Sequence, residues 1–405
     1  MSLSAGPLTA SADPTADQLI GRHLARIRHA ILASCGAGNI ACIALVGGFG
    51  RGEGGVRRTP DGTLRPVNDY DILVVTRREG LLARLWLRRC LKRQEPALTG
   101  ELGIRVDIAC KTPAMLRAWP ACVEAYEVAV GHQVLWGDEA PLQRIPWREA
   151  AALPVSEASR YLFNRGAALL WARRLVEAQG PGRCFVALSM TDSRMGPGMT
   201  NEQRFILVAI QKAWLAWGDA VLLLNGRYTA LYRDRAGRLA EIELPPALDF
   251  VARRYPEALH FKLQPDFAPY AAADLPTLLD ETIQRHERVW RWVEMARGAP
   301  AAAPAAFWRA YHRRRGPRLG ERGRRLYHLA LNLWRVRPRT LAGLLEHPEE
   351  RLAGALPLLL FDVAWDQALA ATLAASFGLS RPADRASLSD RLIALWHPGE
   401  PFVGG

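Results

Sequence analysis

Three aspartates lie in or beside short apolar runs within the first 110 residues of the chain. Asp69 and Asp71 belong to "NDYDILVV" (68–75), and Asp107 belongs to "GIRVDIAC" (103–110). Side chains two apart on a strand point to the same face, so Asp69 and Asp71 can share one cation, and Asp107 completes the set if its strand lies alongside. Three clustered carboxylates repel one another without a counter-charge, and Mg²⁺ binds carboxylates together with substrate phosphates. The set predicts a magnesium site suited to phosphoryl-group chemistry.

A glycine-rich segment, "VGGFGRGEGG" (46–55), precedes the first two aspartates. Glycines let backbone amides approach phosphate oxygens closely, and a helix that begins there adds its positive N-terminal dipole. Arg51 can add a charge-assisted contact to a phosphate. For Glu53 two interpretations stay open: a glutamate that favours a helix N-terminus, or a partner that orients Arg51. Together the glycine turn and the Asp-x-Asp strand predict a nucleotide site.

Short β-branched runs and helical periodicity indicate the elements that position these residues. Strands are expected at 39–48, 69–75 and 103–110, with helices at 16–38 and 81–93. The insertion "VRRTPDGTLRP" (56–66) has a Pro-Asp-Gly turn signal and predicts a hairpin. Two interpretations of this hairpin stay open: its three arginines overhang the site, or it is only a solvated insertion. The arginines are Arg57, Arg58 and Arg65.

Strand signals nearly vanish after residue 156, and helical periodicity marks 161–177 and 201–224. The fold class expected is α+β, a small mixed-sheet domain followed by a larger, mostly α-helical region. The Ala- and Pro-rich stretch 298–306 is expected to be a linker. The boundaries expected are a disordered tail 1–15, the mixed-sheet domain 16–150, a helical domain 151–297, the linker 298–306 and a C-terminal helical region 307–405.

"VGGFGRGEGG", "NDYDILVV" and "IRVDIA" in this order resemble the nucleotidyltransferase superfamily of the DNA polymerase beta type. The sequence of the glycine segment is most similar to that of enzymes that uridylylate the nitrogen-regulatory PII protein and of small bacterial nucleotidyltransferases. The resemblance covers residues 40–112, which it makes the core of a catalytic domain at 16–150. Many members have Gly-Ser at the turn where this chain has Gly47 and Gly48, and the interval to Asp69 is longer than usual.

The resemblance implies a role for each matched residue. Asp69 and Asp71 would bind two Mg²⁺ ions, for which Mn²⁺ can substitute, and Asp107 would bind one of them. Gly47 and Gly48 would contact the β- and γ-phosphates of a nucleoside triphosphate, with Arg51 nearby. An acceptor hydroxyl would attack the α-phosphorus in line, and pyrophosphate would leave.

The larger helical region of such enzymes commonly supplies a basic residue that clamps the triphosphate. Lys212 is a candidate, although a lysine on a solvated helix face fits the sequence equally well. Asn164 and Arg165 can line a cleft between the two parts, although core packing with a surface arginine is the more ordinary interpretation. The tryptophans of the helical region are expected in its core.

The function expected is transfer of a nucleoside monophosphate onto a hydroxyl of a small molecule or protein. One alternative is a nucleotide-binding regulator or antitoxin-like protein without turnover. Another is template-independent addition to RNA, for which the basic stretch 309–325 speaks.

The composition of the chain sets limits on its partners and its compartment. A net charge of +13 raises a nucleic-acid partner, but only four of the 53 basic residues are lysines, an arginine bias that also fits a G+C-rich coding background. Nucleic acid is therefore not favoured. The six cysteines form no CxxC pair, and no run reaches 18 apolar residues. The N-terminus lacks a basic leader before an apolar core, so no membrane partner and a cytoplasmic location are expected.

Overall fold

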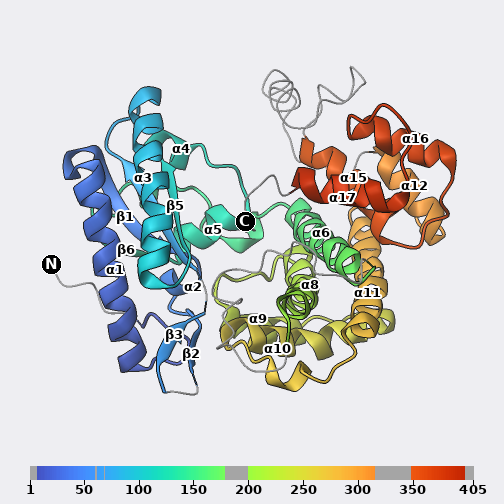
Figure 1. The fold of residues 1–405 in the computed structure, drawn as a ribbon, viewed down its shortest axis with the longest axis horizontal. Coiled ribbons are helices and arrows are strands. Elements are labelled where there is room, and N and C mark those ends of the chain that lie inside the picture. The colour runs from blue at the N-terminus through green and yellow to red at the C-terminus, as the bar shows by residue number, and fades with distance from the viewer. Residues whose placement is uncertain (1–6, 60–61, 68, 178–198, 315–347, 397–405) are drawn as a thin grey trace.

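The computed structural model of the chain describes residues 7–59, 62–67, 69–177, 199–314 and 348–396. An N-terminal part with a mixed sheet is followed by a larger part built of helices (Figure 1). The α+β class expected from the sequence is confirmed.

The main sheet has four strands in the order β5 (Val106–Lys111), β4 (Tyr70–Thr76), β1 (Ile40–Val46) and β6 (Gln133–Gly137). β4 runs parallel to β5, and β1 is antiparallel to both β4 and β6. The three strands expected from the sequence are confirmed. β6 was not predicted, and its alternating burial is weak because it lies at the edge of the sheet.

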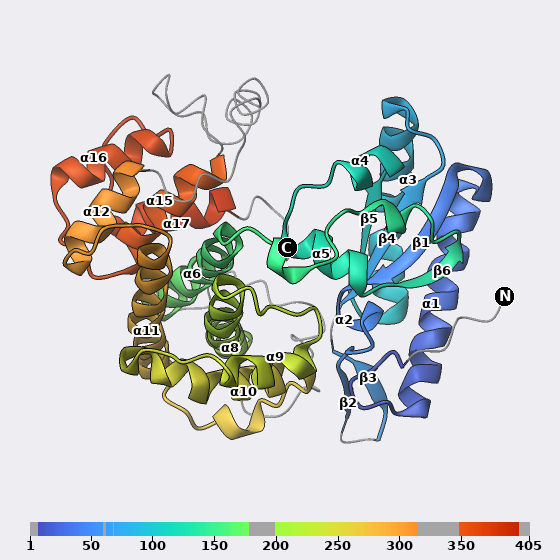
Figure 2. The same cartoon turned by 180° about the vertical axis from the view of Figure 1, so that it is seen from behind.

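Helices cover both faces of this sheet, as Figures 1 and 2 show from opposite sides. On one face lie α1 (Pro14–Cys35) and α3 (Leu81–Leu102), whose buried leucines and isoleucines pack on Ile43 and Ile72. On the other face, α4 (Pro113–Arg117) and α5 (Val123–Val130) pack against Ala44 and Leu73. Alternate residues of β1 and β4 therefore enter different cores, as the two-residue period of a strand requires.

The insertion between β1 and β4 forms the expected hairpin, with β2 (Val56–Arg58) paired to β3 (Leu64–Pro66). The tail expected to be disordered to residue 15 is ordered from residue 7 within the described chain. The Ala10 amide donates to the Gly54 carbonyl over 3.1 Å, and the Gly54 amide donates to the Leu8 carbonyl over 3.1 Å. Asp13 then caps α1. For residues 7–15 the structure differs from this expectation because the partner of the tail is the glycine segment, which lies far away in sequence; residues 1–6 lie outside the described residues.

The larger part contains long helices where periodicity predicted them. α6 (Ser156–Glu177) and α8 (Asn201–Leu224) pack against each other and against α11 (Leu275–Ala296). α8 begins with a capping box between Thr200 and Gln203. The further helices are α9 (Tyr232–Ala240), α10 (Asp249–Leu263), α12 (Pro304–Arg314), α15 (Pro348–Leu360), α16 (Gln367–Ser376) and α17 (Arg385–Trp396).

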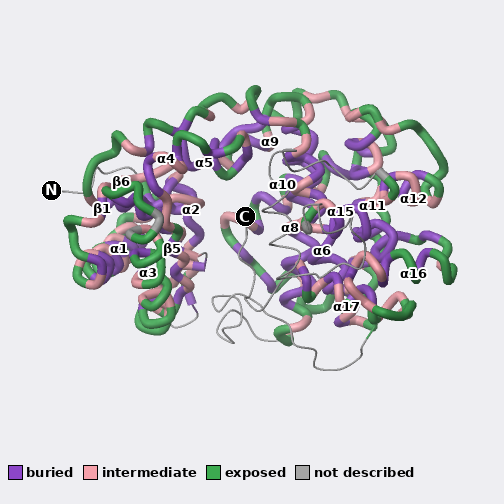
Figure 3. Tube along the Cα trace, turned by 90° about the horizontal axis from the view of Figure 1, so that it is seen from above, coloured by how far each residue is buried: buried purple, intermediate pink, exposed green. Residues whose placement is uncertain are grey.

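In the described part of the chain, one cluster of buried hydrophobic side chains extends through the helical part, and Figure 3 shows in purple where the buried residues lie. The Trp308 ring of α12 lies 5.5 Å from that of Trp290 on α11 and 5.0 Å from Phe361 after α15, measured between centroids. The expected regions 151–297 and 307–405 therefore share one core, and the expected linker is shorter because α12 already begins at Pro304. Trp214, Trp217 and Trp290 are fully buried, which confirms the expectation for them.

α8 is the one described helix that is long and apolar enough to cross a bilayer by composition. However, 94% of its most apolar window is buried inside the protein, among α6, α10 and α11. It is a core helix of the helical part.

Candidate functional site

The three predicted aspartates lie close together at the end of the sheet where β4 and β5 begin. In the parallel pair of strands, Asp71 of β4 stands opposite Asp107 of β5, and Asp69 directly precedes β4. One carboxylate oxygen from each residue lies within 4.8 Å of the others. Asp71 is also paired with Val46, the last residue of β1, after which the glycine segment begins. The sheet register therefore brings the triad and the glycine segment together.

Gly47 lies directly against the triad. Its φ is +65°, a left-handed conformation that favours glycine, and a Cβ atom there would come 2.0 Å from Asp71 Oδ2. By contrast, a Cβ atom at Gly48 would meet nothing closer than 3.6 Å. The protein itself thus requires glycine at position 47, whereas a Cβ atom at position 48 would make only ordinary van der Waals contact.

Electrostatic repulsion is concentrated on Asp71. Burial, together with the neighbouring charges of Asp69 and Asp107, raises the pKa of Asp71 well above its ordinary value, and Lys262 and Arg51 oppose this rise. Asp107 is also paired with Arg105, whose NH2 lies 3.0 Å from its Oδ2. Asp107 therefore has a cation of its own within the cluster.

Two cations of the helical part, Lys212 of α8 and Lys262 of α10, interact electrostatically with the triad, and Arg165 of α6 interacts with Lys212. Burial, Arg165 and Lys262 lower the pKa of Lys212 to about 7, whereas Asp69 acts in the opposite direction. The charge of Lys262 is felt by both Lys212 and Asp71. The predicted candidate Lys212 is therefore near the acidic residues, and Lys262 joins it from a helix that the sequence did not single out.

A cleft of about 260 Å³ lies between the sheet and α6. Its walls carry Gly47, Asp71 and Asp107 from the sheet part, with Arg160 and Asn164 from the helical part. Asn164 thus lines the cleft, as one interpretation of the sequence expected. Further lining residues are Val46, Arg51, Ile72, Lys92, Ile108, Ala109, Val123, Glu124, Glu127, Val128, Glu157 and Tyr161.

Arg51 borders this cleft, but its guanidinium is engaged inside the protein. NH1 donates to Glu127 Oε2 over 2.9 Å, and only 4% of the side chain is exposed. Although burial alone would lower it, Glu127 and neighbouring tyrosines raise the pKa of Arg51. In this structure the Arg51 guanidinium is therefore held in an ion pair with Glu127, and its nucleotide contact stays a prediction.

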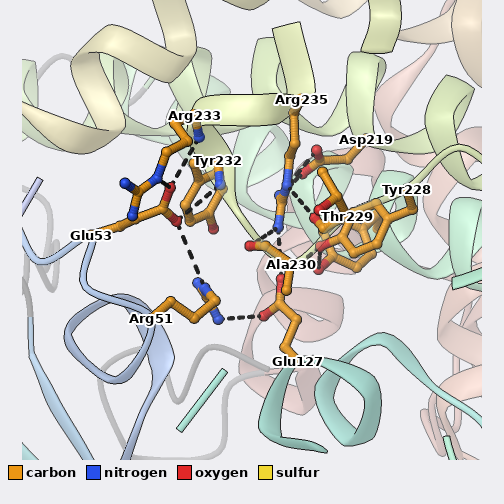
Figure 4. A network of polar contacts seen from close by, with 11 residues as sticks. Arg51, Glu53, Glu127, Asp219, Tyr228, Thr229, Ala230, Tyr232, Arg233 and Arg235 are labelled. Carbon is orange, nitrogen blue, oxygen red and sulfur yellow. Dashed lines mark hydrogen bonds and ion pairs between the residues drawn. The ribbon is translucent and has the colours of Figure 1, made fainter. Parts of the chain in front are cut away.

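Glu53 has features of both interpretations of the sequence, because its Oε2 lies 3.9 Å from Arg51 Nε and its carboxylate also caps a helix. It follows the single turn α2 (Gly47–Gly50) and contacts the first turn of α9 (Figure 4). Its Oε2 accepts from the Tyr232 amide over 2.9 Å, and its Oε1 accepts from the Arg233 amide over 3.0 Å. Glu53 therefore caps a helix, but one that lies about 180 residues away in sequence.

Two functional candidates were missed from the sequence, Lys262 and Glu127. Lys262 carried a usable signal, because it is one of only four lysines and follows Lys212 as the last. Glu127 had none, since it stands in the apolar helix α5 without a motif around it.

Comparison with protein-family models finds no match for this chain, and comparison with curated proteins finds none either. The geometry of the site is therefore what supports a functional assignment.

Proposed function

We propose that the chain is a magnesium-dependent nucleotidyltransferase. It would move a nucleoside monophosphate from a nucleoside triphosphate to a hydroxyl of a small molecule or protein and release pyrophosphate. The observation that carries this proposal is the register of β4 and β5, which sets Asp71 opposite Asp107 with Asp69 beside them.

The residues present fit the metal that this chemistry needs. All three donors are carboxylates, the oxygen ligands that Mg²⁺ takes and that Mn²⁺ accepts as well. Asp69 and Asp107 lie close to the buried Asp71, and Gly47 has no Cβ atom to occupy the space beside that carboxylate, so the acidic site is compact. Asp69 and Asp71 would hold both ions and Asp107 one of them. When bound, these ions stabilise charge on the entering and leaving oxygens of phosphoryl transfer.

The residues of this chain would orient the two substrates. Gly47 lines the cleft beside Asp71, where a phosphate would approach the backbone of the turn. Lys212 and Lys262 lie within electrostatic reach of the acidic residues, and Arg165 within reach of Lys212, so these cations would balance the negative charge of a triphosphate. Arg160 and Asn164 of the helical part line the same cleft as Asp107, and their polar groups would contact the acceptor.

The RNA alternative has little support in the described part of the basic stretch. Trp308 is fully buried, and Arg309 NH2 lies 2.8 Å from Asp366 Oδ2 and donates to the Ala364 carbonyl. The remainder of that stretch, from residue 315, lies outside the described residues.

The test is pyrophosphate release with Mg²⁺, each nucleoside triphosphate and a lysate as the source of acceptors. Asp71→Asn and Asp107→Asn should abolish release, whereas Asp280→Asn, which removes an exposed carboxylate on α11, should leave it unchanged. Retained turnover in Asp71→Asn would rule out the assignment. Magnesium-dependent nucleotide binding without turnover on any acceptor would instead support the regulator.

Thermal unfolding gives a second measurement of the metal site. Because the folded-state pKa of Asp71 is raised, its contribution to stability is present below the ordinary pKa of 3.8 and is lost as pH rises through the folded value. At neutral pH in EDTA, Asp71→Asn should therefore melt higher than the wild type. Mg²⁺ should raise the melting temperature of the wild type and leave that of Asp71→Asn unchanged.

A further inference from the structure

The charged residues of the glycine segment belong to a network that joins the two parts of the protein. We propose that Arg51 and Glu53 are positioning residues, which hold the glycine turn at a fixed distance from the helices that carry Lys212 and Lys262, rather than nucleotide ligands. Their effect on catalysis rests on the proposed function, whereas their joining of the two parts does not. The interdomain network consists of Arg51, Glu53, Glu127, Asp219, Arg233 and Arg235 (Figure 4).

Glu53 supplies the cap that α9 lacks. The residue at the N-cap position, Leu231, makes no side-chain hydrogen bond to the helix, so the first amides of α9 have no local acceptor. The Glu53 carboxylate, 1% exposed, accepts from two of them and from Arg233 Nε at 3.2 Å. A buried carboxylate at a helix N-terminus is favoured by the helix dipole as well as by hydrogen bonds. The start of α9 is thereby fixed to the glycine segment.

Arg51 extends the network toward the core of the helical part. Its partner Glu127 also accepts from Arg235 NH2 and from the Tyr228 hydroxyl, each over 2.7 Å. Arg235 is fully buried and donates from NH1 to both oxygens of Asp219 at 3.1 Å. Ion pairs thus connect α2, α5, α8 and α9 in one chain.

Charge balance argues against a phosphate role for Arg51. The network contains three arginines and three carboxylates, so the positive charge of Arg51 is already neutralised within the protein. Moving Arg51 onto a phosphate would leave Glu127 with fewer partners in a buried place, which is costly. The stem of Arg51 is also enclosed, because a Cβ atom at Gly131 would lie 2.4 Å from its Cγ.

The position of the network explains what it would do for the reaction. Glu53 and Arg51 follow the turn that borders Asp71, while Asp219 follows Lys212 by two turns on α8. The network therefore sets the separation between the acidic residues and the lysines that face them. Misplacement of reacting groups by about 1 Å can lower a rate by about a hundredfold.

The first experiment needs no nucleotide and measures hydrogen exchange at the amides of Tyr232 and Arg233. Glu53→Ala should speed their exchange by about tenfold or more, with Glu53→Gln intermediate because one amide can still find an acceptor. Glu241→Ala, which removes an exposed carboxylate at the other end of α9, is the matched control and should leave them unchanged. Unchanged exchange in a folded Glu53→Ala protein would overturn the proposal.

The second experiment compares Arg51→Met, Glu53→Gln and Glu127→Gln in the binding of MgATP and MgUTP without acceptor, and in kcat with acceptor. We expect Kd within about threefold of the wild type and kcat lower by about 10- to 100-fold for all three. The double variant Arg51→Met/Glu127→Gln should be no worse than its more damaging single variant, because the two residues form one contact. Melting temperatures identify any variant that fails to fold.

Glu127 carries a carboxylate, which does not bind phosphate. A loss of kcat shared by the Arg51 and Glu127 variants therefore indicates a positioning role for Arg51, whereas a loss of nucleotide binding in the Arg51 variant alone indicates a phosphate contact. If Arg51→Met alone weakens triphosphate binding more than tenfold and Glu127→Gln does not, Arg51 is a phosphate ligand and the proposal is wrong. If the wild type neither binds nor turns over nucleotide, the proposed function fails, and the exchange measurement still decides whether Glu53 joins the two parts.

Discussion

Replacement of Gly47 by alanine tests whether the Asp71 carboxylate is part of the reacting centre. The new Cβ atom would lie 2.0 Å from Asp71 Oδ2, where contacts below 3.0 Å are not tolerated, so the carboxylate must move by about 1 Å. In addition, alanine at a φ of +65° costs about 1–2 kcal/mol. The first effect acts on the site and the second on stability, so a suitable control can separate them.

Gly226→Ala is that control. Gly226 has a φ of +64°, nearly the same as Gly47, but a Cβ atom there would meet nothing within 4 Å. Both variants should therefore lose about 1–2 kcal/mol of unfolding free energy, which lowers the melting temperature by a few degrees. Only Gly47→Ala should also lose about a hundredfold in kcat, equivalent to roughly 2.7 kcal/mol of transition-state stabilisation.

The assay is pyrophosphate release at saturating nucleotide and Mg²⁺, with chemical denaturation of the same samples. Wild-type turnover in Gly47→Ala would show that the position of Asp71 does not matter to the reaction. An equal loss of turnover in Gly226→Ala would show that the loss follows general destabilisation rather than the carboxylate.

Two further predictions concern buried titratable groups. Burial and neighbouring cations lower the pKa of Lys212 to about 7, and a triphosphate that binds near it should raise that pKa, so binding at pH 7.5 should take up protons. Calorimetry in buffers of different ionisation enthalpy measures this uptake. If the uptake persists in Lys212→Gln, a group other than Lys212 binds the proton and the prediction is wrong. His286 accepts from Trp217 Nε1 and donates to the Leu162 carbonyl, and burial lowers its pKa from 6.5 to about 4. Its contribution to stability, about 3 kcal/mol, is therefore present above pH 6.5 and lost as pH falls to about 4. Between pH 7 and pH 4, the unfolding free energy measured by chemical denaturation should fall less steeply with pH in His286→Leu than in the wild type. Equal pH dependence in the two proteins would contradict the prediction.

The sequence was sufficient for the elements that carry local signals. β-branched runs located β1, β4 and β5, and helical spacing located α6 and α8, because burial on one or two faces imposes a period on the residues themselves. The identity of the acidic triad followed from the same pattern. The predicted site required the strand of Asp107 to lie beside that of Asp71. In the structure the parallel register of β4 and β5 sets these two residues opposite each other.

The glycine segment shows where sequence reasoning stops. Its glycines suggested close approach to phosphate, yet Cβ atoms at Gly47, Gly50, Gly52 and Gly54 would collide with the protein itself, and only Gly48 among these five loop glycines is free of such a clash. Packing demands and ligand demands both select glycine, so the residue type alone does not separate them. The structure does, because it shows which neighbour each glycine meets.

What the sequence alone determined about this protein is its α+β class, its main elements and the carboxylates of the candidate site, because each depends on residues near one another in the chain. The tertiary structure decided how the two parts are joined and therefore which groups Arg51 and Glu53 contact. Glu53 accepts from the amides of Tyr232 and Arg233, and Arg51 donates to Glu127. Backbone amides carry no sequence signature, and a charge pair across such separations leaves no period to detect, so only the folded chain reveals these contacts.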